Sequence, residues 1–147
     1  MLDSPCSITR TLGVVGERWS FLILREAFFG VTHFARFRES LGVAPDVLSD
    51  RLSTLVEYGV MERVPYQEPG ARVRQAYELT PAGRELAVVL GALQQWGDAH
   101  LPRPEGPTVV RRVRGTKRPV HIGFIDDKGH EIPGEDVAFE RTAAYPT

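Results

Sequence analysis

Hydrophobic side chains recur at helical spacing through the first third of the chain. Residues 8–16 carry one apolar stripe and end in a glycine, which predicts a short helix. The stretch ERWSFLILREAFFG, residues 17–30, is apolar on nearly every side and favours a central buried helix that ends at Gly30. Residues 33–42, HFARFRESLG, have an apolar and a charged face, so we expect a short amphipathic helix closed by Gly42.

A further helical pattern begins after only the residues GVA. Pro45 suits the first position of a helix, and Gly59 suits its C-terminal stop. Two helices joined by a short turn that contains glycine form a helix-turn-helix, which the sequence therefore predicts over residues 33–59. The apolar face of the second helix carries Leu48, Leu52, Leu55 and Val56, and its opposite face carries Asp46, Ser49, Asp50 and Ser53.

Beyond Gly59 the pattern changes to that of strands. The runs VMERVPY, residues 60–66, and VRQAYEL, residues 73–79, are rich in β-forming side chains, and QEPGAR joins them. They predict a hairpin with a Pro-Gly tip. A hairpin directly after a helix-turn-helix is the wing of a winged helix, so we expect a mainly α fold with a β-hairpin wing.

The segment LTPAGREL starts a longer helix, with Thr80 as its N-cap and Pro81 at its first position. Its apolar stripe continues toward Pro102 and is longer than one small domain needs. Packing against a second copy is the natural use of such a stripe, because symmetric dimers are the commonest oligomers. The predicted dimerisation residues are Leu86, Val89, Leu90, Leu93 and Trp96.

Prolines and glycines at residues 102–107 mark a linker. We therefore divide the chain into a winged helix and dimerisation domain, residues 1–101, and a linker with a small β-rich extension, residues 102–147. Short strands are expected within residues 109–115 and 118–134, turning at DDKG. The run RRVRGTKR, residues 111–118, is interpreted as a solvated strand and turn, with contact to flanking DNA or to an acidic partner as the alternative.

Composition narrows the class of protein. A chain of 147 residues with 42% hydrophobic content can bury a core, and its apolar runs are too short for a membrane span or a signal peptide, so we expect a cytoplasmic protein that does not enter a membrane. The single Cys6 cannot form an internal disulfide. Nucleic-acid-binding domains are usually strongly basic, whereas this chain has a net charge of -1. Candidate DNA contacts must therefore be judged by where the basic residues lie and not by the net charge.

Three stretches resemble the HxlR-type branch of the MarR-related winged helix regulators of bacteria. They are PCSITRTLGVVGERWSFLILRE, FARFRESLGVAPDVLSDRLSTLVEYGVMER and YELTPAGREL, and the resemblance covers roughly residues 4–101. It implies a homodimeric transcription factor that binds an inverted repeat in double-stranded DNA. The second helix of the motif would enter the major groove and the wing would lie against the flanking backbone.

Basic and hydroxyl side chains on these elements are the candidate DNA contacts. Serines on the outward face of the second helix suit phosphates or bases, while arginines on the preceding helix and on the wing suit phosphates. Arg18 starts the buried helix, where a phosphate site and a capping or packing role are alternatives. The predicted set is Arg18, Arg36, Arg38, Pro45, Asp46, Ser49, Asp50, Arg51, Ser53, Arg72 and Arg74.

Two carboxylates on this face need an explanation. Asp46 lies in the first turn of the helix, where the helix dipole favours an acidic side chain by roughly 0.3–1 kcal/mol. Asp50 lies beyond that turn. It could accept a hydrogen bond from cytosine or repel wrong partners, but we favour the orientation of Arg51 or of a wing arginine.

Effector and metal sites have weaker signals. Cys6 precedes a helix N-terminus, a setting that lowers a thiol pKa, and some members of the resembled family use a cysteine here as a switch; a buried inert cysteine is the alternative. Five aromatic side chains either line a pocket for a small-molecule effector or belong to the core. The four histidines lack zinc spacing, so we predict no metal and no cofactor. The aromatic residues are Phe28, Phe29, Phe34, Phe37 and Trp96.

Together these patterns predict a sequence-specific transcriptional regulator, with repression favoured because a bound dimer can obstruct polymerase. The alternative is a winged helix protein-interaction module with weak or no DNA binding, which the net charge and the two aspartates motivate. An enzyme is not predicted, since no nucleophile, base and orienting group are grouped in the sequence.

Overall fold

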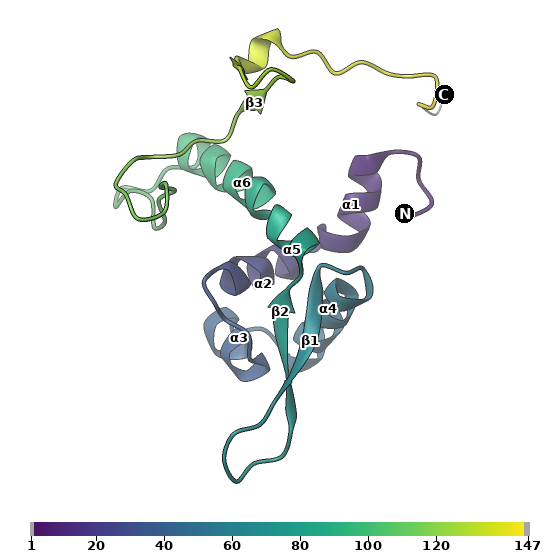
Figure 1. The fold of residues 1–147 in the computed structure, drawn as a ribbon, viewed down its shortest axis with the longest axis vertical. Helices are drawn as coiled ribbons and strands as arrows, with labels where there is room; N and C mark the ends of the chain where they lie inside the picture. The colour runs from purple at the N-terminus through teal and green to yellow at the C-terminus, as the bar shows by residue number, and fades with distance from the viewer. Residues whose placement is uncertain (1, 146–147) are drawn as a thin grey trace. The chain divides into compact units, whose positions relative to one another are not determined.

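The computed structural model describes residues 2–145 (Figure 1). The chain forms two compact units, and the boundary between them in the sequence falls between Ala87 and Val88. The predicted boundary at residues 101 and 102 rests on linker composition and stays a prediction. Among the described residues, no helix has the length and apolar character needed to cross a membrane.

The first unit is a winged helix, which confirms the predicted fold class. Each predicted helix up to residue 59 is present with shifts of one or two residues at its ends, and the hairpin follows the fourth helix. The elements are α1 (Ser7–Val15), α2 (Arg18–Phe28), α3 (Phe34–Leu41), α4 (Pro45–Glu57), β1 (Met61–Tyr66), β2 (Arg74–Leu79) and α5 (Pro81–Glu85).

Turn chemistry sets the angle between α3 and α4. Gly42 follows α3 with a φ of 62°, a left-handed conformation, and its N–H donates to the carbonyl of Arg38. Ala44 is extended and Pro45 occupies the first turn of α4. The short turn therefore ends one helix and starts the next without a long loop.

The core lies where α2, α3 and α4 cross. Six side chains there are fully buried, and each contributes roughly 1.5–3 kcal/mol through the burial of apolar surface. The leucine stripe of α4 is buried as predicted. The six are Ile23, Leu24, Phe37, Leu48, Leu52 and Leu55, all 0% exposed.

The expectation that α2 is buried on nearly every side is wrong for the single chain. Phe29 is 61% exposed and Phe28 is 37% exposed, whereas Ile23 and Leu24 are buried. The reason is geometric, because α3 and α4 pack against the face of α2 that carries Ile23 and Leu24, and Phe28 and Phe29 at its C-terminal end lie away from that face.

The wing is a two-stranded antiparallel hairpin. Its register runs from Met61 opposite Leu79 to Tyr66 opposite Arg74. The N–H of Tyr77 donates to the carbonyl of Thr32 at 2.8 Å, which ties β2 to the segment before α3. Gly70 in the tip has a φ of 75°, as the predicted Pro-Gly turn requires.

The segment after the wing begins as predicted but forms two helices. Thr80 caps α5, because its hydroxyl accepts from the N–H of Gly83 at 3.1 Å. A Cβ atom on Gly83 would lie 2.0 Å from the carbonyl oxygen of Val60, so a glycine is needed for this close approach. The chain then breaks at Leu86, and α6 spans Ala87–His100.

The second unit contains most of α6 and the C-terminal extension. The predicted hairpin at DDKG is confirmed by β3 (Phe124–Ile125) and β4 (Glu131–Ile132), which are followed by the short 3-10 helix η1 (Gly134–Asp136). Asp126 caps this turn by accepting from the N–H of His130, and this hydrogen bond, the largest of several causes, lowers the pKa of Asp126. In place of the other short strands expected before this hairpin, residues 109–120 form one isolated bridge, between Arg112 and Pro119.

Candidate nucleic-acid interface

The exposed face of α4 is polar and lies opposite the buried leucines. Asp46, Ser49, Asp50 and Ser53 are all exposed, which matches the predicted face. Beside this face, the hydroxyl of half-buried Thr54 donates back to the carbonyl of Asp50 at 3.1 Å and is thus engaged with its own helix.

Asp50 and Arg51 form an ion pair on this surface. The Nη2 atom of Arg51 donates to Oδ2 of Asp50, with 25% of the Arg51 side chain and 64% of the Asp50 side chain exposed. The carboxylate therefore restricts the directions in which this guanidinium can point. Asp46 makes no side-chain cap but lies in the first turn of α4, where its negative charge interacts favourably with the helix dipole.

Arg63 is a basic residue of this surface that the sequence interpretation missed. From β1 its Nη2 atom lies 3.3 Å from the hydroxyl oxygen of Ser53, to which it donates, and its guanidinium lies 5.7 Å from the centre of the Tyr77 ring. The wing thus supplies a cation at the edge of α4. The signal for it in the sequence is an arginine within the strand predicted directly after the second helix.

The other predicted arginines differ in whether they form an ion pair within the chain. Arg36 on α3 is paired with Glu39 at 2.6 Å, with both side chains about 70% exposed. Arg38 is exposed on the same helix. Arg72 and Arg74 are exposed on the wing and form no ion pair with the residues that the structure describes.

Arg18 lies at the start of α2, as expected, and its guanidinium stacks 4.8 Å from the centre of the Trp19 ring. This contact is the packing role that was the alternative to a phosphate site. Its part in DNA binding stays a prediction.

The apolar stripe of α6 is largely exposed. Trp96 is 60% exposed, Leu93 is 53% exposed and Val89 is 39% exposed, while Leu90 is half-buried. The fifth predicted residue, Leu86, is half-buried and lies just before α6. Large apolar side chains clustered on one face of a helix mark an interaction surface, because water solvates them poorly.

Cys6 occupies the N-cap position of α1 and is half-buried. The hydroxyl of Thr9 and then the backbone N–H of Thr9 lower the pKa of Cys6, and the charge of Arg10 adds a smaller effect. A larger share of the thiol is therefore ionised near neutral pH than in an ordinary cysteine.

The five aromatic residues differ in burial. Phe37 is fully buried in the core, whereas Phe29 and Trp96 are exposed. One hollow lies in the second unit, and its lining includes Gly97, Leu101 and Pro107 but none of the five. Across residues 2–145, no group of three or more potential metal ligands is gathered.

A helix-turn-helix on a three-helix core, followed at once by a hairpin wing, defines the winged helix class. The model of one family within this class, described as HxlR-like helix-turn-helix, matches residues 14–105. The chain belongs to this family.

The chain is similar to a sequence relative and to solved structures. The uncharacterized HTH-type transcriptional regulator Rv3095 of Mycobacterium tuberculosis is 51% identical over 106 residues, which span 72% of this chain and 66% of that protein. The crystal structure of PA1607 matches with a TM-score of 0.81 and 37% identity, over 96% of this chain and 98% of that one. The redox regulator HypR in its oxidized form matches with a TM-score of 0.58 and 25% identity, over 65% and 97%.

Proposed function

We propose that this protein is a transcriptional regulator that binds double-stranded DNA through α4 and the wing. The observation that carries the proposal is the exposed polar face of α4, with Ser49, Ser53 and the Asp50–Arg51 pair on it and Arg63 at its edge. A helix of this kind fits the major groove, where side chains meet base edges. The family supports the same class, as does the similarity to Rv3095, which is named an HTH-type transcriptional regulator.

The wing and α3 would position the protein on the duplex. Arg38, Arg72 and Arg74 are exposed cations on elements that flank α4 and suit phosphate contacts. Such contacts release counterions, so binding would weaken steeply as salt rises. The net charge of -1 does not oppose this assignment, because the arginines lie where a backbone would pass.

The regulator would act as a homodimer on an inverted repeat. The exposed stripe of α6 with Val89, Leu93 and Trp96 supports association with a second copy, which would bury these side chains. Two recognition helices related by a twofold axis would meet two half-sites, and a bound dimer would repress transcription by obstructing polymerase.

Selection of bound sites from random duplex DNA tests the proposal. An inverted repeat among the selected sites, with affinity that falls as salt rises, would support both the dimer and the DNA contact. No retention on random DNA at about 50 mM salt would refute DNA binding and favour a protein-interaction module.

A second candidate role is the sensing of oxidants by Cys6. The lowered pKa of this thiol supports it, as does the similarity to HypR, which is itself described as a redox regulator. We expect peroxide or a quinone to change operator binding of the wild type and to leave Cys6→Ser unchanged. Equal responses of the two proteins, measured by fluorescence anisotropy, would remove Cys6 from the mechanism.

A further inference from the structure

The C-terminal extension packs against one face of α6. Gly91 and Gln95, four residues apart, lie on this face, and Gln94 lies between them on the same side. Gly91 is buried, and a Cβ atom there would lie 3.1 Å from Cδ1 of Ile122. The glycine therefore lets the extension approach the helix closely.

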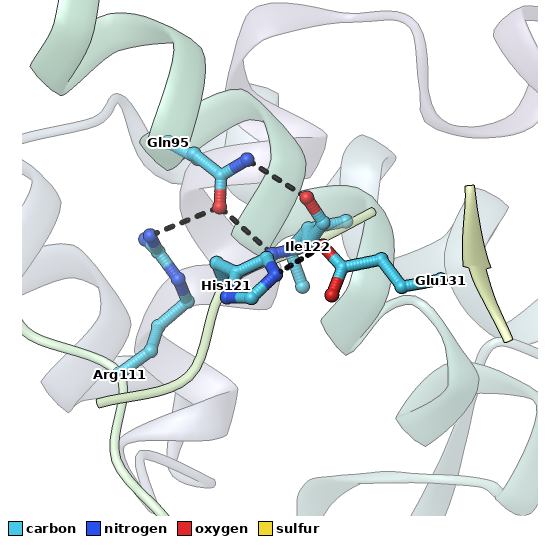
Figure 2. A network of polar contacts seen from close by, with 5 residues as sticks. All are labelled: Gln95, Arg111, His121, Ile122 and Glu131. Atoms are coloured by element: carbon cyan, nitrogen blue, oxygen red, sulfur yellow. Dashed lines mark hydrogen bonds and ion pairs between the residues drawn. The ribbon is translucent and has the colours of Figure 1, made fainter. Parts of the chain in front are cut away.

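Hydrogen bonds from two glutamines, Gln94 and Gln95, hold the extension in place, and Figure 2 shows those of Gln95. The side-chain amide of Gln95 makes a paired contact with the backbone of Ile122: its Nε2 donates to the carbonyl at 2.9 Å, and its Oε1 accepts from the N–H at 2.8 Å. Nε2 of Gln94 donates to the carbonyl of Val109 at 2.6 Å. Two points of the extension, thirteen residues apart in sequence, are thus fixed to adjacent positions of one helix.

Arg111 joins the two glutamines. Its Nη1 donates to Oε1 of Gln94 at 2.8 Å, and its Nη2 lies 3.4 Å from Oε1 of Gln95. His121 continues the network to β4, since its Nε2 lies 2.6 Å from Oε1 of Glu131 (Figure 2). Arg111 is therefore engaged in packing, unlike the exposed cations Arg112 and Arg114 beside it.

The apolar stripe lies on the other side of α6. Val89, Leu93 and Trp96 follow one another at helical spacing and remain exposed, whereas Gly91, Gln94 and Gln95 are covered. The extension thus covers one face of α6 and leaves the opposite, apolar face exposed.

The helix has reason to need this support. It is 14 residues long and contains Gly91 and Gly97, and glycine is among the weakest helix formers. Isolated helices of this length are marginal in water. Without packing on the Gly91 face, α6 would fray, and a second copy would have to order it on binding.

We propose that residues 109–122 are a splint for α6, which docks on the face formed by Gly91, Gln94 and Gln95 and holds the opposite apolar face in the form that a second copy binds. The proposal rests on the proposed homodimer. It assigns a role to an extension that lies beyond residues 14–105, which the family model matches, whereas the match to PA1607 covers 96% of this chain.

Gln95→Ala in the full chain tests the splint, with Gln75→Ala on the exposed surface of the wing as the matched control. Hydrogen exchange reports whether residues 109–122 are held, and sedimentation at several concentrations gives the dimer dissociation constant. We expect Gln95→Ala to accelerate exchange at Ile122 and to raise the dissociation constant about tenfold. The control should change neither quantity.

Each other outcome has a defined meaning. If Gln95→Ala accelerates exchange at Ile122 but leaves the dimer dissociation constant unchanged, the splint is wrong and the dimer stands. If Gln95→Ala leaves exchange at Ile122 unchanged, Gln95 does not hold the extension, and the splint is again wrong. A wild-type protein that stays monomeric at every concentration would overturn the proposed dimer and the splint with it. Leu93→Ala provides the reference for direct loss of the dimer face, because it should weaken the dimer while Ile122 stays protected.

Discussion

Asp50→Asn is the most informative single substitution on α4, because Asp50 restrains the guanidinium of Arg51. The Asp50 side chain is 64% exposed and the Arg51 side chain is 25% exposed. An ion pair at such a surface contributes about 0.2–1 kcal/mol to folding stability. The variant should therefore fold normally, and its effect should appear in DNA binding.

The expected effect is a loss of discrimination between sequences. A well-oriented bidentate contact from an arginine to a base contributes about 1–3 kcal/mol of discrimination. Without the carboxylate, Arg51 can point toward a phosphate as easily as toward a base edge. The ratio of operator affinity to nonspecific affinity should then fall by roughly one to two orders of magnitude.

The assay compares bound sites selected from random DNA by the wild type and by two variants, followed by titrations across salt. Asp46→Asn is the matched control, since it makes the same change in the first turn of α4. It should reduce the free energy of unfolding by roughly 0.3–1 kcal/mol and keep the sequence preference. A uniform gain in affinity for all sequences from Asp50→Asn would refute the reasoning and identify simple repulsion of phosphates.

Three further substitutions test neighbouring parts of the structure. Arg74→Ala should weaken binding to all sequences alike and reduce the slope of log affinity against log salt by about one, and an unchanged slope would exclude a phosphate contact. Arg63→Ala should weaken operator binding in anisotropy titrations, whereas unaltered affinity would restrict Arg63 to packing against Tyr77. Gly83→Ala should destabilise the fold by roughly 1–3 kcal/mol in urea titrations, because its Cβ would meet the Val60 carbonyl. A gain of about 1 kcal/mol, as helix propensity alone predicts, would contradict that clash.

Local patterns determined the elements of the winged helix. The leucine stripe of α4 predicted its buried face, and Gly42 and Pro45 predicted the turn before it. These features depend on backbone geometry and burial over a few residues, so they can be predicted from a short stretch of sequence without knowledge of the rest of the chain. The N-cap at Thr80 and the Pro-Gly tip of the wing were predictable for the same reason.

Contacts between elements were not predictable from those patterns. Arg63 reaches Ser53 across ten positions, and Gln95 meets Ile122 across 27. The periodicity around Arg63 or Gln95 does not predict which residue each side chain contacts, because that contact depends on how the elements pack. The exposure of Phe29 has the same origin, since only the placement of α3 and α4 decides which face of α2 they cover.

The sequence by itself therefore determined the order of helices and strands from α1 to the start of α5, the buried face of α4 and the polar face that we propose to meet DNA. The sequence favoured a pairing of Asp50 with Arg51 or with a wing arginine, and the structure selected Arg51. Only the tertiary structure decided that β1 supplies a cation to α4 and that the extension covers one face of α6. Short-range burial and backbone geometry fix the first group. The second group depends on side-chain geometry and on packing between distant segments, which a one-dimensional pattern does not contain.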